Sequence, residues 1–200
     1  MKKLYINSIA IALVILSVFV VIDFIGSATV YAVAGPNTAT NILVTPSTYQ
    51  YTTFKGVPVY RLHITNAGDS DTLLSLAMDP FTGDTANDTL VTLHFYNDAN
   101  DNGIVDQGDV NLGGSAAFAS DNTKQIFTFA SPLTIPNGVT SILVTADGAG
   151  VGNTGIFHLG IDLGTDILMG TAAISNTGAF PFNNAKDLTV SGYRAVVSNY

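Results

Sequence analysis

The chain has 200 residues, a formal net charge of −8, and aspartate as its only acidic residue type. It contains no cysteine, which excludes disulfides, thiolate metal centres and a lipidated N-terminal cysteine. Only seven residues are basic, and they form no basic patch, which argues against nucleic acid as a partner. The length suits one domain with a proper hydrophobic core.

The first 32 residues have the pattern of a secretory signal peptide. Two lysines precede an apolar run from Ile9 to Val21, and Val30-Tyr31-Ala32 is an acceptable cleavage site. We therefore expect a secreted, extracellular or cell-surface protein that begins near Val33 and meets a membrane only through this segment before cleavage. A retained membrane anchor is the alternative, because residues 5–25 are long enough to span a bilayer.

Residues 33–50 are expected to form a loose N-terminal arm. Gly35, Pro36 and Pro46 interrupt regular structure. Residues 41–45 form one short strand in this prediction, with apolar side chains on both of its sides.

The remainder, residues 51–200, is predicted to be an all-β domain. Short segments rich in β-forming residues alternate with turns that contain Gly, Pro, Asn or Asp. No amphipathic helix of ten residues appears in the mature part. This pattern predicts a two-sheet antiparallel β-sandwich, jelly-roll-like in its organisation. The predicted strands are 57–66, 72–78, 89–96, 124–130, 140–147, 155–163, 167–174 and 188–197.

The alternation within these strands also predicts which side chains are buried. Residues two apart in a strand point to the same face, so apolar residues at that spacing mark the core face. The predicted core residues are Tyr60, Leu62, Ile64, Val91, Leu93, Phe95, Phe127, Phe129, Phe157, Leu159 and Ile161.

The strongest motif is the twelve-residue segment 98–109. Oxygen-bearing side chains occupy its positions 1, 3, 5, 9 and 12, and Gly103 occupies position 6. A hard cation needs six to eight oxygens, so alternate residues must point inward around it. The spacing predicts a calcium site, with apolar Val105 facing the protein and fixing the loop. The predicted ligands are Asp98, Asn100, Asn102, the carbonyl of Ile104, Asp106 and Asp109.

The segments around this loop favour strands rather than a helix pair. The loop resembles the calcium loops of dockerins and of secreted β-modules that also close with Asp, which implies a structural ion rather than a sensor. An Asn/Asp/Gly-rich turn without an ion is the alternative. Asp84 and Asp88 either add ligands or form a turn. Asp162 and Asp166 are a weaker second calcium candidate, for which a turn is again the alternative.

No catalytic set stands out. His63, His94 and His158 lie mid-strand, opposite the predicted core face, without ligand spacing. There is no nucleophile elbow, and no Ser/His/Asp combination differs from background. We therefore expect a protein that is not an enzyme, with a secreted hydrolase as a remote alternative.

The order of the predicted segments along the chain resembles that of a known family. A signal peptide and a loose arm precede the segment Val59–Ser75, which holds an early strand ending in the turn Asn66-Ala67-Gly68. This architecture resembles biofilm-fibre proteins of the TasA/camelysin type and their archaeal relatives, the bundling pili and cannula subunits. The resemblance implies a jelly-roll subunit whose arm completes a neighbour's sheet, and similarity to cannula subunits implies calcium-dependent assembly. The calcium loop and the absence of glutamate depart from the bacterial fibre proteins.

Two functions follow as expectations. The first is a secreted structural subunit that polymerises head to tail with copies of itself by donating its N-terminal strand, stabilised by calcium. The second is a calcium-stabilised module or adhesin that binds a carbohydrate or surface. Aromatic residues in predicted loops favour the second function, and they are Tyr49, Tyr51, Phe54, Phe180 and Phe182.

Overall fold

The computed structural model describes residues 37–42, 49–51, 53–80, 88–149, 155–174, 180–183 and 188–190. The predicted signal peptide, arm residues 33–36 and 43–48, and Asp84 lie outside these ranges. Across the ranges that are described, no helix is long and apolar enough to cross a membrane.

The described part of the chain consists of strands and two single-turn 3₁₀ helices, so the all-β prediction is confirmed. The elements are β1 (Asn37–Ile42), β2 (Tyr49–Tyr51), β3 (Thr53–Asn66), β4 (Asp71–Pro80), η1 (Asp88–Leu90), β5 (Val91–Asn97), β6 (Val110–Asn111), β7 (Ala116–Ala117), β8 (Gln125–Ile135), β9 (Gly138–Ala149), β10 (Gly155–Phe157), β11 (Leu159–Ile161), η2 (Gly164–Asp166), β12 (Ile167–Met169), β13 (Phe182–Asn183) and β14 (Leu188–Val190).

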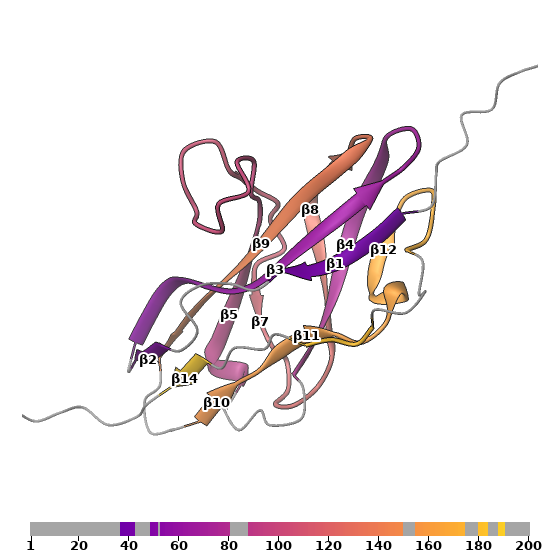
Figure 1. Cartoon of the computed structure of the whole chain (residues 1–200). Helices are drawn as coiled ribbons and strands as arrows, with labels where there is room; N and C mark the ends of the chain where they lie inside the picture. Colours follow the sequence, from indigo (N-terminus) through magenta and orange to yellow (C-terminus); the bar gives the residue numbers. More distant parts are fainter. Residues whose placement is uncertain are drawn as a thin grey trace, which may run out of the picture. The chain divides into compact units, whose positions relative to one another are not determined.

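Two antiparallel sheets form the sandwich (Figure 1). The first has the strand order β1-β3-β9-β5-β6, with β7 also paired to β5. The second has the order β12-β4-β11-β13, with β8 also paired to β4. A smaller group, β10-β14-β2, contains a parallel pair between β14 and β2. The predicted strand 155–163 is divided at His158 into β10 and β11.

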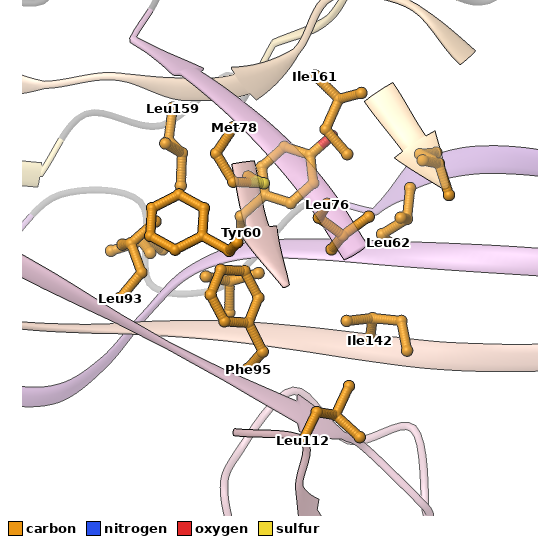
Figure 2. Packing of buried hydrophobic residues seen from close by; sticks show 14 of the residues in the cluster. Tyr60, Leu62, Leu76, Met78, Leu93, Phe95, Leu112, Ile142, Leu159 and Ile161 are labelled. Carbon is orange, nitrogen blue, oxygen red and sulfur yellow. The ribbon is translucent and has the colours of Figure 1, made fainter. Parts of the chain in front are cut away.

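The core lies between the two sheets, and every predicted core residue is buried. Figure 2 shows side chains from β3, β4, β5, β9 and β11 meeting in this layer. The ring of Phe95 lies 5.1 Å from that of Phe127 and 5.4 Å from that of Phe129. The buried Tyr60 hydroxyl donates a hydrogen bond to the carbonyl of Phe182 (3.3 Å), and burial raises the pKa of this phenol. Alternation therefore located the core correctly because each strand has one inward face.

The first strand differs from the prediction. It begins at Asn37 rather than Asn41, and it pairs antiparallel with β3 from Asn37↔Asn66 to Ile42↔Arg61. Among residues 37–40, whose side chains the structure describes, those of Asn37 and Ala39 point inward and are buried. A polar and a small residue give no apolar alternation, so the sequence pattern placed the strand too late.

Candidate functional site

The predicted calcium loop, residues 98–109, joins β5 to β6 and projects from the first sheet (the pink segment in Figure 1). The backbone N–H of Asp98 donates to the carbonyl of Ser141 on β9 (3.0 Å), which fixes the loop's first residue to the sheet. Gly103 has a φ of 75°, in the left-handed region that glycine adopts without steric cost. The sharp turn at position 6 therefore forms where the motif requires it.

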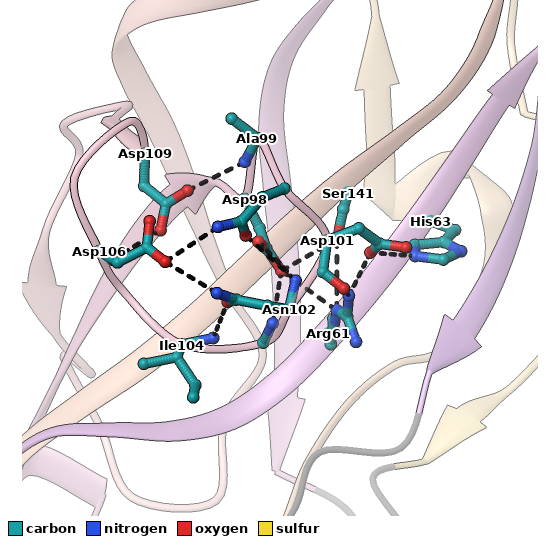
Figure 3. Close-up of polar contacts among 12 residues, drawn as sticks. Arg61, His63, Asp98, Ala99, Asp101, Asn102, Ile104, Asp106, Asp109 and Ser141 are labelled. Atoms are coloured by element: carbon teal, nitrogen blue, oxygen red, sulfur yellow. Dashed lines mark hydrogen bonds and ion pairs between the residues drawn. The ribbon is translucent and has the colours of Figure 1, made fainter.

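The side chains of Asp98, Asn102 and Asp106, three of the predicted ligands, turn toward the inside of the loop (Figure 3). The Asn100 and Asn102 amides both donate to the same oxygen of Asp106, at 2.9 and 2.8 Å. This oxygen, Asp106 Oδ2, is thus the point at which three of the predicted ligands meet.

The first and last of the predicted ligands, Asp98 and Asp109, hold the backbone of the loop. The Asp98 carboxylate accepts hydrogen bonds from the N–H groups of Asn102 (3.1 Å) and Gly103 (2.9 Å). The Asp109 carboxylate accepts from Ala99 and from Asp106, both at 2.9 Å. These contacts close the twelve residues into one ring, with the first and last residues each bonded across it.

The predicted role of Val105 is wrong. Its side chain is 40% exposed and that of Ile104 is 62% exposed, so neither fixes the loop to the protein. In this loop Ile104 takes part through its backbone, whose N–H donates to the Asn102 side-chain oxygen (2.8 Å). An apolar side chain can fix a loop only where it packs against an apolar surface. Here a cationic side chain lies between the loop and the sheet instead.

That cation is Arg61 on β3, which sequence reasoning missed. Its Nε lies 3.3 Å from the Asp98 carboxylate, and its terminal nitrogen bonds to the carbonyl and carboxylate of Asp101. His63, two residues on, places Nε2 2.7 Å from Asp101. Burial would raise the pKa of Asp101, but the hydrogen bond from His63 and the charges of His63 and Arg61 outweigh it and lower the pKa. Figure 3 shows this cluster between the loop and the sheet.

The donor set limits which ion the loop suits. Within the described residues, no group of three His or Asp side chains is placed to hold a metal ion. The loop instead combines three carboxylates with two side-chain amides and a backbone carbonyl, which are all oxygen donors. Such a set fits a hard cation with many oxygen ligands better than zinc or copper.

The other acidic candidates have different partners. Lys124 Nζ lies 2.9 Å from Asp166 and 3.3 Å from Asp162, so an ammonium group is placed at the second candidate site. Burial alone would lower the pKa of Lys124, but these two carboxylates outweigh it and raise the pKa. Asp88 is buried and accepts a hydrogen bond from the N–H of Asn122 (2.8 Å), so it contacts the 121–122 turn rather than the predicted calcium loop.

One polar set on the first sheet was not singled out from the sequence. His94 Nδ1 lies 2.9 Å from the Ser115 hydroxyl, and His94 Nε2 lies 3.3 Å from Asp147. Asp147 also accepts a hydrogen bond from the N–H of Gly56 (2.6 Å). These contacts connect β3, β5, β9 and the turn before β7. Only strand register brings the four residues together, so no local motif could have revealed them.

Of the aromatic residues expected on loops, Phe54 and Phe182 do not lie on an exposed binding surface. Phe54 and Phe182 are buried in the core, and the ring of Phe180 stacks 4.0 Å from that of Phe182. The side chains of Tyr49 and Tyr51 lie outside the described residues. The prediction of exposed loop aromatics is therefore wrong for Phe54 and Phe182, because β3 and β13 point these rings inward.

A cavity of about 420 Å³ opens beside the predicted calcium loop. Hydroxyl groups, carboxylates and one apolar edge line it. The lining residues are Asn97, Asp98, Ala99, Asp101, Thr134, Pro136, Val139, Thr140 and Ser141.

A buried polar contact, separate from those around the loop, lies at the edge of the first sheet. It joins β1 to the first residue of β4. The side-chain amide of Asn37 donates to the Asp71 carboxylate (2.8 Å) and to the carbonyl of Ala172 (2.9 Å). Burial would raise the pKa of Asp71, but hydrogen bonds from Ala172, Thr72, Asn37 and Thr171 outweigh it and lower the pKa. Asp71 is thus an ionised carboxylate inside the protein, satisfied by short-range donors.

No protein-family model, no curated protein and no solved structure matches this chain.

Proposed function

We propose that the protein is a secreted structural subunit that assembles into an extracellular filament or tubule by donating its N-terminal strand to the next copy, with calcium stabilising the subunit. The observation that carries this proposal is the position of β1. It is the edge strand of the first sheet, paired along its length with β3, and its first residue, Asn37, also forms an isolated parallel bridge with Ile174.

An edge strand near the N-terminus is suited to exchange between copies. Its described contacts are the pairing with β3, the bridge from Asn37 to Ile174, the hydrogen bonds of the Asn37 side chain, and the burial of Asn37 and Ala39. A β1 from another copy can make the same contacts. Without β1, the edge of β3 exposes unpaired N–H and C=O groups that invite another strand. Because each copy gives one strand and accepts one, the contact is head to tail and propagates.

Deletion of residues 33–45 tests this proposal. We expect the full mature chain to form filaments in negative-stain electron microscopy and the deletion variant to form none. Added peptide of residues 33–45 should bind the deletion variant, because it restores the partner of β3. Normal polymerisation of the deletion variant would show that β1 is an ordinary strand of its own subunit.

The loop 98–109 supports calcium as the stabilising ion in this proposal. A cation placed where the two Asn amides meet Asp106 would replace their N–H donors, and rotation of each amide presents its oxygen instead. Arg61 beside Asp98 weakens cation binding, because like charges repel. A dissociation constant of about 0.1–1 mM, as in extracellular modules, suits such a loop.

Calcium should raise the melting temperature of the mature chain, because an ion that binds only the folded state stabilises it. At a hundredfold excess over the dissociation constant the gain is about 2.7 kcal/mol. Asp106→Ala should abolish the calcium-induced rise measured by calorimetry. This variant is preferable to Asp98→Ala, which also loses the ion pair with Arg61.

The matched control is Gln107→Ala, in the same loop at a position that supplies no predicted ligand. It should retain the calcium-induced rise. An equal rise in Asp106→Ala, or no rise in the unchanged protein, would leave the loop as a turn without an ion.

A second candidate function is supported by the cavity beside the loop. Its volume of about 420 Å³ lies within the usual range for small-ligand sites, and its hydroxyl and carboxylate lining suits a polyhydroxylated ligand such as a carbohydrate. A mature protein that forms no filaments with or without calcium, but binds immobilised glycans, would favour this function over assembly.

A further inference from the structure

We infer that Asn37 is the residue by which an incoming β1 is recognised, and that the buried carboxylate of Asp71 is its receptor. This inference rests on the proposed strand donation and adds the side-chain contact that fixes its register. The partner is a second copy of this chain.

The receptor is held by contacts that do not involve β1. One oxygen of Asp71 accepts hydrogen bonds from the N–H groups of Thr72 (2.7 Å) and Thr171 (2.9 Å). The other oxygen accepts from the N–H of Ala172 (2.9 Å). The residue is only 3% exposed. Three backbone donors from two separate segments thus hold an anion in place, and one oxygen also faces the β1 position.

Asn37 matches this receptor in charge and in donor number. It is fully buried, and its two amide hydrogens go to Asp71 Oδ2 and to the carbonyl of Ala172. Both partners are acceptors, so the amide nitrogen must face them. An aspartate at position 37 would bring a second carboxylate against Asp71, and an apolar residue would supply no donor.

The contact also selects one register. Successive strand residues point to opposite faces, so a shift of one residue would replace Asn37 with Thr38 at the buried position. Main-chain hydrogen bonds to β3 are nearly independent of sequence, and Ala39, the other inward residue among the described side chains of β1, is small. Among the β1 side chains that the structure describes, Asn37 is therefore the one whose contacts distinguish the correct register from its neighbours.

The test uses full-length mature chains with single substitutions. Asn37→Asp should raise the concentration needed for filament growth at least about tenfold, because a charge-assisted hydrogen bond is lost and like charges meet. Thr38→Asp adds the same charge on the exposed face of β1 and should assemble like the unchanged protein. Near-ultraviolet circular dichroism checks that each variant is folded. Asn37→Ser, which introduces no charge, should give a smaller loss in the same direction.

A mixing experiment distinguishes donation of β1 to another copy from pairing of β1 within its own copy. Asp71→Ala retains Asn37 but has lost the receptor, whereas Asn37→Asp retains the receptor. Each alone should sediment as a monomer, and a 1:1 mixture should form a heterodimer in which Asp71→Ala donates β1 to Asn37→Asp. Assembly of Asn37→Asp at the wild-type concentration would overturn the recognition role, while loss of assembly on deletion of 33–45 would still support donation. Absence of filaments in the unchanged protein would overturn both.

Discussion

Replacing Phe95 with alanine is expected to lower the free energy of unfolding by about 3–5 kcal/mol, measured by urea denaturation. The ring is fully buried between the sheets and packs against both Phe127 and Phe129 of β8. Truncation removes the apolar surface and leaves a cavity against β8 that the surrounding side chains cannot fill without moving. The chain has no disulfide to limit the loss.

Ile126→Ala is the matched control for this substitution. Ile126 lies on β8 next to Phe127, but its side chain is 67% exposed, so its removal leaves no cavity. The unfolding free energy of this variant should stay within about 0.5 kcal/mol of the unchanged protein. If the two variants lost equal stability, the core between the sheets would not lie where we describe it.

Replacing Gly114 with alanine should cost about 2–5 kcal/mol of unfolding free energy, from two separate causes. Its φ of 73° is unfavourable for a residue with a side chain. A Cβ at this position would also lie 2.3 Å from the carbonyl oxygen of Thr128, which is backbone and cannot rotate away. The segment after β6 must therefore shift from β8.

Gly56→Ala isolates the first cause. Gly56 has a φ of 62°, but no atom lies within 4 Å of a Cβ built there. Its substitution should cost only the conformational penalty of about 1–2 kcal/mol. Thermal melts of Gly114→Ala and Gly56→Ala compare the two losses of stability. Equal losses would show that residue 114 does not lie close to the backbone of Thr128.

The amino-acid sequence by itself determined the fold class and the core. Alternation with period two is a property of the strand backbone, so apolar residues at that spacing identified the inward faces of β3, β5 and β8 before any pairing was known. The spacing of residues 98–109 likewise placed a sharp turn at Gly103, since few residues adopt its positive φ. Both signals are local, and neither depends on which strands become neighbours.

Only the tertiary structure decided what surrounds these features. Arg61 lies beneath the loop, where the sequence had suggested Val105, because the register of β3 with β9 brings Arg61 to Ser141 and Asp98. Asn37 and Asp71 are 34 residues apart, and a polar pair inside a core has no apolar pattern to mark it. Contacts of this kind depend on strand order and register, which arise from the packing of the whole chain rather than from any short segment.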